Sequence, residues 1–349
     1  MTIIQGKGTL PREQAGRNIH YDDSSLANYK KVEQGDFIIH LRSFEGGLEM
    51  ANEDGIVSPA YTILRCKKPH SSLFYEAYFH TDEFINHILS KSVEGIRDGR
   101  QISYEAFKWI GLPYCNVSEQ EKIAQLFCTL SHRIEKQQQM VDALKKYKRG
   151  LLNQVFSAIS KGSQLRKLRE LVHVSGGKTP SMSNSLYWNG DIVWISSKDM
   201  KSSRISGSEL KTTNLALNEL TLYHPGTLLL VARSGILKHS LPLAILEVDA
   251  TINQDIKALQ VHGCNAFYLY YAILSQEDNI IRTLVKTGTT VQSLMMDSFL
   301  NIEIPTPDID LQQSIIDKLA KLEKYVDVQK KELSLLSQMR NGLLQQLFI

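Results

Sequence analysis

The chain contains 349 residues, more than the roughly 150 of a typical domain, so it is expected to form two or more domains. Hydrophobic residues make up 42% of the chain and charged residues 22%, which argues against a disordered or fibrous protein. The formal net charge is only +3, so a nucleic-acid-binding surface would have to arise from local patches of basic residues.

No segment is expected to cross a membrane. The longest uninterrupted apolar runs, such as residues 228–232 and 241–246, are far shorter than the ~20 residues that a bilayer requires. Residues 1–10 lack the basic and apolar regions of a secretion signal, and the four cysteines show neither paired nor zinc-binding spacing. We therefore expect a cytoplasmic protein without a membrane partner, disulfides or a bound metal.

Residues 1–113 are predicted to form a first globular domain. A strand is expected over residues 36–39, after the turn signal at Gly35, and a helix over residues 83–89. Residues 107–112 are predicted to be the last strand of this domain, matching residues 299–304 later in the chain.

Residues 114–160 are predicted to form one long helix. Its apolar residues recur at alternating steps of four and three, with Gln137 as a polar member of the series: Ile123, Phe127, Leu130, Ile134, Val141 and Leu144. This spacing turns one apolar stripe toward a partner helix, as in a coiled coil.

Residues 161–305 are predicted to form a second globular domain of the α+β class. Strands are expected at residues 192–195, 227–232, 243–248 and 256–261, and a helical stretch around residues 267–285.

Residues 306–349 repeat the pattern of the first helix. Residues 113–156 align with residues 305–348 without a gap, and the identical positions include Pro113 with Pro305, Gln120 with Gln312 and Phe156 with Phe348. About a quarter of the aligned positions are identical, whereas unrelated sequences of average composition would match at about one position in seventeen. The sequence therefore predicts an internal pseudo-two-fold repeat of a domain followed by a long helix, over residues 1–113, 114–160, 161–305 and 306–349.

The two long helices are expected to pair with each other in an antiparallel coiled coil. In that register Gln137 meets its repeat counterpart Gln329, and a polar pair in an apolar seam can fix the helix register. We therefore expect these two side chains to be in contact. The alternative is that each helix packs only on its own domain.

The first domain is expected to be shorter than the second at its N-terminal end. The stretch before Gly35 is much shorter than the stretch from the start of the second domain, at Leu165, to the equivalent Gly226. The first domain would thus lack an opening segment, including any counterpart of residues 176–181.

Residues 176–179 (GGKT) are similar to the end of an NTPase phosphate loop, but Val172 stands where that motif needs glycine, and Pro180 follows directly. Two interpretations remain, a flexible cationic loop that approaches a phosphate backbone and an ordinary surface turn. The sequence also lacks the motifs of zinc proteases, serine hydrolases, redox dithiols and amino-methyltransferases. It therefore predicts no catalytic residue and no cofactor.

Basic residues are concentrated between Lys145 and Arg169, where there are eight of them and no acidic residue. They could neutralise phosphates, or they could be a solvated helix end whose cations suit the helix dipole. Residues 187–199, whose end is polar, and the polar loop of residues 284–293 carry the hydroxyl, amide and amine groups that contact DNA backbones and bases. Trp188 and Trp194 are predicted to be core residues rather than base-stacking residues.

Five motifs stand out: residues 55–61 (GIVSPAY), 175–181 (SGGKTPS) and 193–200 (VWISSKDM), and the helix endings 149–156 (RGLLNQVF) and 340–348 (RNGLLQQLF). In this order and with a duplicated helix, they resemble the specificity subunit of a Type I restriction-modification system. The resemblance implies two target recognition domains that each read half of a split DNA sequence, joined by two antiparallel spacer helices. The chain departs from the family at the shortened first domain.

The resemblance also implies the partners of the chain. The partners would be double-stranded DNA, two modification (methyltransferase) subunits and the restriction (endonuclease/translocase) subunits, and the chain itself would be a non-catalytic subunit. We expect the DNA-binding residues to be Lys178, Thr179, Ser181, Lys198, Arg233, Ser234, Lys286, Thr287 and Thr289 in the second domain, and Arg42, Ser43, Arg97 and Arg100 in the first. The alternative, which the near-neutral charge favours, is a coiled-coil scaffold for protein assembly without DNA specificity of its own.

Overall fold

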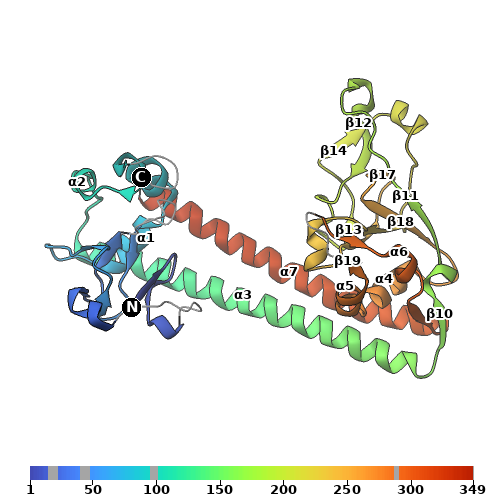
Figure 1. The fold of residues 1–349 in the computed structure, drawn as a ribbon, viewed down its shortest axis with the longest axis horizontal. Helices are drawn as coiled ribbons and strands as arrows, with labels where there is room; N and C mark the ends of the chain where they lie inside the picture. Colours follow the sequence, from blue (N-terminus) through green and yellow to red (C-terminus); the bar gives the residue numbers. More distant parts are fainter. Residues whose placement is uncertain (15–22, 40–47, 95–100, 287–290, 349) are drawn as a thin grey trace. The chain divides into compact units, whose positions relative to one another are not determined.

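The computed structural model describes residues 1–14, 23–39, 48–94, 101–286 and 291–348 (Figure 1). The chain divides into two compact units. We call Met1–Met140 together with Gln329–Ile349 the first unit, and Val141–Val328 the second unit.

Two long helices contribute to both units. Helix α3 spans Val117–Ser160 and helix α7 spans Ile309–Leu347. Every residue of the predicted apolar series on both helices is buried or half-buried. The helices therefore follow the pattern of apolar spacing, and each unit contains part of α3 and part of α7.

In the first unit the two helices run antiparallel. The ring of Phe127 lies 5.9 Å from that of Phe348 between centroids, and the Arg133 guanidinium lies 3.4 Å from Glu332. The Gln137 side-chain amide donates a hydrogen bond of 2.9 Å to the side-chain oxygen of Gln329. Residue numbers in these contacts thus rise along α3 as they fall along α7, and the two repeat-related glutamines are in contact.

In the second unit a carboxylate joins the two helices to the globular part. Glu323 on α7 pairs with the Lys148 amine on α3 and accepts hydrogen bonds from the hydroxyls of Tyr270 (3.3 Å) and Tyr271 (3.1 Å). Burial, followed by the charge of Glu323, raises the pKa of both phenols, so they remain donors at neutral pH.

The first unit is built from short strands and one aromatic helix. Helix α1 spans Ser72–Phe79, followed by the π-helix η4 (Glu83–Ile88) and the short helices η5 (Leu89–Ser92) and α2 (Tyr104–Phe107). The strands are β1 (Thr2–Ile4), β2 (Gly8–Leu10), β3 (Lys30–Val32), β4 (Phe37–Ile39), β5 (Leu48–Met50), β6 (Gly55–Val57), β7 (Thr62–Leu64), β8 (Val93–Glu94) and β9 (Gln101–Ile102). Strands β5, β4 and β7 form a three-stranded sheet, on which the aromatic face of α1 packs.

A buried carboxylate anchors the β1–β2 hairpin to this sheet. Glu49 on β5 accepts hydrogen bonds from the amides of Gly6 (2.8 Å) and Gly8 (3.0 Å), and the His80 imidazole lies 3.5 Å away. Burial raises the pKa of Glu49, but His80 and the two amides outweigh it, so the net pKa is lowered. The interaction with Glu49 raises the pKa of His80, although burial of the imidazole alone would lower it.

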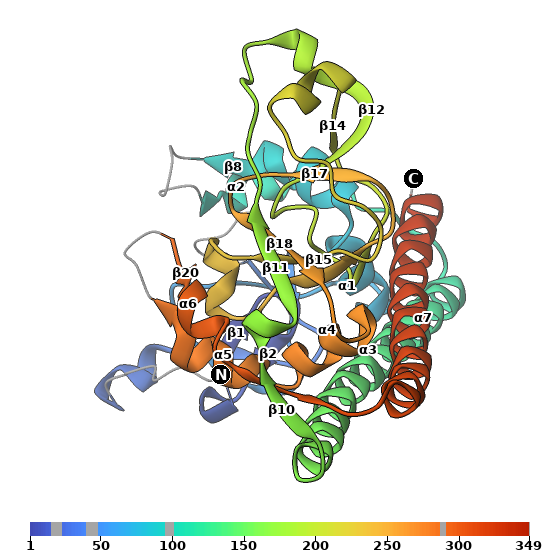
Figure 2. The same cartoon turned by 90° about the vertical axis from the view of Figure 1, so that its right-hand side faces the viewer.

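The second unit contains a five-stranded sheet in the order β11-β18-β15-β16-β13 and a three-stranded sheet in the order β14-β12-β17. Figure 2 shows β12 and β14 extending beyond the larger sheet. The strands are β10 (Gln164–Lys167), β11 (Val172–Gly176), β12 (Trp188–Ile195), β13 (Arg204–Ile205), β14 (Leu210–Thr212), β15 (Leu228–Val231), β16 (Leu243–Leu246), β17 (Ala250–Ile252), β18 (Ile256–Val261), β19 (Val285–Lys286), β20 (Ser293–Leu294) and β21 (Glu303–Thr306).

Helices α4 (Ala266–Leu274), α5 (Glu277–Leu284) and α6 (Met296–Phe299) complete this unit. Leu228 and Leu230 on one face of the larger sheet share a buried cluster with α4 and with the unit's parts of α3 and α7. Leu229 and Val231 on the other face share a cluster with β12 and β17. The larger sheet is thus buried on both faces, which explains the uninterrupted apolar run of β15.

The repeat extends to individual hydrogen bonds. In the first unit the buried Gln120 accepts from the amide of Ser71, the residue before α1, and Tyr75 donates to the carbonyl of Pro113. In the second unit Gln312 accepts from the amide before α4, and Tyr268 donates to the carbonyl of Pro305. The two glutamines are equivalent in the sequence repeat, as are the two prolines, so the same connection is made twice.

Two predictions of secondary structure were wrong. Residues 107–112 follow the short helix α2 and form no strand, and the corresponding strand of the second unit, β21, begins only at Glu303 rather than at residue 299. The helical stretch predicted around residues 267–285 is confirmed as two helices, α4 and α5, with a turn at Ser275 and Gln276 between them.

None of the described helices has a long, apolar, weakly charged stretch that could cross a bilayer.

Replacing Glu323 by alanine should destabilise the second unit by about 3 kcal/mol, because the partly buried amine of Lys148 and two phenols lose their acceptor. Glu332→Ala on the same helix is a matched control. It removes an exposed ion pair with Arg133 and should cost no more than about 1 kcal/mol. Urea unfolding of the full chain measures both, and equal costs would contradict this role of Glu323.

Candidate nucleic-acid interface

One short turn in the second unit is hydrogen-bonded to three of the predicted DNA-binding residues, Lys178, Thr179 and Arg233. It comprises Ile252, the last residue of β17, and residues 253–255 (NQD) before β18, and we call it the central turn. The side chain of Asn253 accepts a hydrogen bond of 3.1 Å from the amide of Asp255, and the amide of Asn253 donates to the carbonyl of Ile195 (2.9 Å). The turn is therefore fixed to the end of β12.

On one side, the central turn holds the loop that follows β11. The amide of Lys178 donates to the carbonyl of Ile252 (2.9 Å), and the Thr179 hydroxyl bonds to the side chain of Gln254. A β-carbon at Gly177 would lie 2.1 Å from the carbonyl oxygen of Ile252. Only glycine therefore allows this close approach.

Two buried tryptophans donate hydrogen bonds to the main chain of the same loop. The indole N–H of Trp194 donates to the carbonyl of Lys178 (3.3 Å), and that of Trp188 donates to the carbonyl of Ser181 (3.0 Å). The two rings meet edge to face with centroids 5.1 Å apart. The prediction that both are core residues is confirmed by their burial, and they fix the backbone of the loop.

On its other side, the central turn holds the residues after β15. The carbonyl of Asp255 accepts from the amides of Ala232 (2.8 Å) and Arg233 (3.3 Å). Arg233 forms an isolated β-bridge with Ser293, which pairs with Lys286 between β19 and β20. The hydroxyl of Ser234 accepts from the amide of Ile236 (3.4 Å) and so caps a short helix.

Lys198 lies on the segment after β12, close in sequence to the contact between Ile195 and the central turn. Asp199 folds this segment by accepting hydrogen bonds from the amide and hydroxyl of Ser196 and from the amide of Glu209. Burial raises the pKa of Asp199, but these hydrogen bonds outweigh it and lower the net pKa. The carboxylate therefore remains charged, and Lys198 is left exposed beside it.

The central turn is thus hydrogen-bonded to three predicted residues, Lys178, Thr179 and Arg233. Ser181, Ser234 and Lys286 are held by other contacts of the same segments, and Lys198 follows Ile195 on the segment after β12. Six others lie outside the described residues: Thr287, Thr289, Arg42, Ser43, Arg97 and Arg100.

Sequence analysis missed the central turn itself and a further cation. Lys257 follows the turn and is the strand partner of Gly176, and its amine would lie 2.9 Å from a β-carbon at that glycine. The polar run NQD between two apolar strands is a turn signal that could have drawn attention to this segment.

The cationic and polar side chains near the central turn suit a negatively charged ligand that also offers hydrogen-bonding groups. Lys178, Lys198 and Arg233 are exposed, and the Lys178 amine lies 3.6 Å from the carboxylate of an exposed Glu219. The Thr179 hydroxyl and the Gln254 amide, which bond to each other, lie in the same segments as Lys178 and the central turn. In the ranges that the structure describes, no cluster of three or more His, Cys, Asp or Glu side chains could hold a metal ion.

The basic cluster of residues 145–169 has a different character. Four of its cations form ion pairs within or beside the second unit: Lys145 with Asp142, Lys148 with Glu323, Arg149 with Asp278 and Arg166 with Glu170. This favours the interpretation as a helix end whose charges stabilise the fold.

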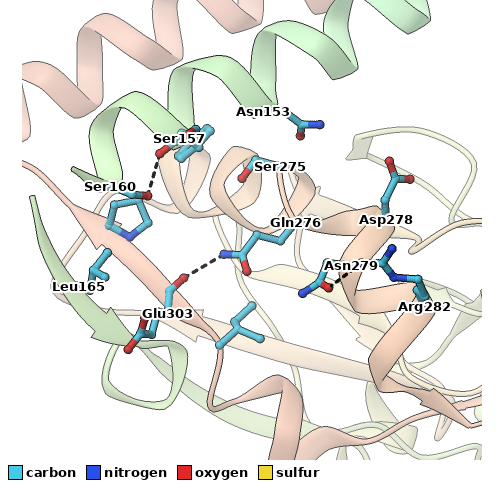
Figure 3. A pocket seen from close by; sticks show the side chains of 13 residues that line it. Asn153, Ser157, Ser160, Leu165, Ser275, Gln276, Asp278, Asn279, Arg282 and Glu303 are labelled. Carbon is cyan, nitrogen blue, oxygen red and sulfur yellow. Dashed lines mark hydrogen bonds between the residues drawn. The ribbon is translucent and has the colours of Figure 1, made fainter. Parts of the chain in front are cut away.

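Each unit also has a groove at the end of one long helix. In the second unit a groove of about 720 Å³ lies between the end of α3, with Asn153 and Ser157, and the turn before α5, with Gln276 and Asp278 (Figure 3). In the first unit a groove of about 640 Å³ lies between the end of α7 and the residues after α1. Their helix walls contain the repeat-related pair Phe156 and Phe348, so the grooves are duplicated as the repeat is.

Gly177→Ala should displace the loop after β11, because its β-carbon would clash with two carbonyl oxygens of the central turn. Loss of the Lys178 hydrogen bond, worth about 1 kcal/mol, should speed hydrogen exchange of that amide about fivefold. Gly207→Ala is the control, since its β-carbon would meet no atom within 4 Å. Unchanged exchange in Gly177→Ala, measured by mass spectrometry, would show that the turn does not hold the loop.

Comparison with known proteins agrees with this architecture. The sequence model of the Type I restriction modification DNA specificity domain matches residues 160–338, just over half of the chain. The Type I restriction enzyme EcoR124I/EcoR124II specificity subunit of Escherichia coli is 36% identical over 162 residues, which are 45% of this chain and 40% of that protein. The MjaIX specificity subunit of Methanocaldococcus jannaschii is 29% identical over 197 residues, 55% of this chain and 45% of that protein. The matched parts thus span less than half the length of these relatives.

Two solved structures share the fold at low sequence identity. The S subunit of a Type I restriction-modification system from M. genitalium has a TM-score of 0.59 at 16% identity and covers 92% of this chain and 84% of its own. A chain from a study of complex assembly and conformational transition of the type I R-M system has a TM-score of 0.58 at 15% identity, covering 91% and 83%. With the α+β architecture and the match over residues 160–338, these findings show that the chain belongs to the family of Type I restriction-modification DNA specificity domains.

Proposed function

We propose that the chain is a DNA-binding specificity subunit that reads a bipartite target for a Type I restriction-modification complex. The observation that carries the proposal is the central turn, which holds the cationic loop of Lys178 and the segment of Arg233 by main-chain hydrogen bonds. Both segments lie inside the part of the chain that matches the specificity domain.

The cationic groups and the uncharged polar groups of these segments have different roles in this proposal. Exposed amines and guanidinium groups, such as Lys178, Lys198 and Arg233, neutralise phosphates and orient the domain on the duplex. Hydroxyl and amide side chains, such as Thr179 and Gln254, are short and uncharged, which suits them to contacts with base edges. The tryptophan hydrogen bonds preorganise the loop, so that little entropy is lost when it binds.

The proposed division of labour follows the repeat. Residues 161–305 form one target recognition domain, and residues 1–113 form a second, shortened one that reads the other half of the target. The long helices, residues 114–160 and 306–349, form an antiparallel coiled-coil spacer between them. The contact between Gln137 and Gln329 supports this arrangement, because a half-buried polar pair in an apolar seam disfavours shifted registers.

The chemistry of modification and cleavage belongs to partner subunits in this proposal, and the chain itself is non-catalytic and binds no cofactor. Two modification subunits and the restriction subunits assemble on it in the cytoplasm. The duplicated grooves at the ends of α3 and α7 support a stoichiometry of two, because equivalent surfaces accept equivalent partners.

Lys178→Ala should weaken binding to every duplex and lower the slope of log K against log[salt] by about 0.9, the value for one lost phosphate contact. Lys122→Ala is the control, because this exposed amine lies on α3 outside the interface and should leave the slope unchanged. Mobility-shift titrations of the subunit assembled with its modification subunits, at several salt concentrations, measure both. Equal slopes for Lys178→Ala and the unsubstituted chain would favour a protein scaffold.

A further inference from the structure

The two units differ at the segment that leads into each long helix. In the second unit this segment is β21, which pairs antiparallel with β10 from the beginning of the same repeat. Its counterpart in the first unit, by the alignment of Pro113 with Pro305, is the segment 111–114, which we call the open edge. Among the strands that the structure describes, none pairs with the open edge.

In the second unit the segment from β10 onward covers the edge closely. The register pairs Gln164 with Thr306 and Arg166 with Ile304. Beyond the strand, the amide of Leu168 donates to the carbonyl of Ile302 (2.9 Å), and the Leu168 side chain is fully buried. One continuous segment, residues 164–171, therefore supplies both hydrogen bonds and apolar contacts.

In the first unit the same positions are exposed. Ile304 is completely buried, whereas its counterpart Leu112 is 40% exposed, and Tyr114 is 62% exposed. Trp109, just before this segment, is 82% exposed. Among the described residues, no hydrogen bond joins the main chain of Gly111 or Leu112 to a neighbour.

The surroundings of the edge are otherwise equivalent. The carbonyls of Pro113 and Pro305 accept hydrogen bonds from Tyr75 and Tyr268, respectively, and a buried glutamine lies in the first turns of the helix that follows each proline. The open edge therefore keeps the setting in which β21 receives β10.

The hydrogen-bonding groups of the open edge are also suitable for a strand. Proline cannot donate, so the pair of Pro305 with Leu165 is a non-hydrogen-bonded pair, and the neighbouring pair at Ile304 must be hydrogen-bonded. Leu112 is equivalent to Ile304 in the repeat, so its main-chain N–H and carbonyl would face an added strand. Pro113 is equivalent to Pro305 and would occupy a non-hydrogen-bonded position.

We propose that the open edge binds, by β-strand addition, a peptide segment with the chemistry of residues 164–171, which cover the equivalent edge of the second unit. The second unit shows the chemistry of this occupant: an extended basic stretch followed by a turn that buries two leucines, Leu168 and Leu171. Main-chain hydrogen bonds hold the strand, and the leucines supply the apolar contacts. This inference does not depend on DNA binding by the chain.

The test uses a synthetic peptide of residues 161–172 as the probe and the full chain as the receptor. The peptide should shift the emission of Trp109 to shorter wavelength in a saturable way, because Trp188 and Trp194 are already buried and only Trp109 is strongly exposed among the three. A peptide in which Leu165, Leu168 and Leu171 are replaced by aspartate should cause no shift. This control leaves the receptor unchanged.

Leu112→Pro in the full chain removes the donor that faces the strand and should abolish the shift, with circular dichroism confirming that the helices remain folded. The absence of a shift with the unmodified peptide would overturn the proposal. An equal shift with the aspartate peptide, or an undiminished shift in Leu112→Pro, would overturn it as well, because the peptide would then bind without forming the strand.

Discussion

The burial of one apolar stripe on each long helix is the constraint on which the rest of the structure depends. A stripe with a four-three spacing must face another apolar surface, and within each unit α3 and α7 satisfy each other in antiparallel contact. The globular parts then pack on a pair of helices. Aromatic residues of α1 contact Phe127 and Phe348 in the first unit, and α4 contacts Phe156 and Leu319 in the second.

The candidate interface uses the opposite strategy, since its residues lie on loops that a rigid scaffold positions. The central turn joins three segments that are far apart in the sequence, and each junction is a main-chain hydrogen bond. Side chains at the surface can therefore change without loss of the loop geometry. Gly177 and the two tryptophans hold this frame through close packing and hydrogen bonds to the main chain of the loop.

Sequence analysis predicted the parts of the structure that depend on periodicity. The spacing of Phe127 or Leu319 in the helices and the apolar runs of β15 and β18 are local signals. The central turn could not be derived, because its contacts to Lys178 and Arg233 join residues distant in the chain. The strand predicted over residues 107–112 failed for a related reason: a strand needs a partner, and the sequence pattern around Leu112 does not show whether one is present.

The most direct test of the central claim is to exchange residues 165–304 for the same segment of a specificity subunit with a known target. Sequencing of methylated sites in cells that carry the complete system would then report both halves of the recognised sequence. Our account predicts that one half changes to that of the donor, while the other half and the spacing are kept. A target that is unchanged, or changed in both halves, would contradict the assignment of one half to the second unit.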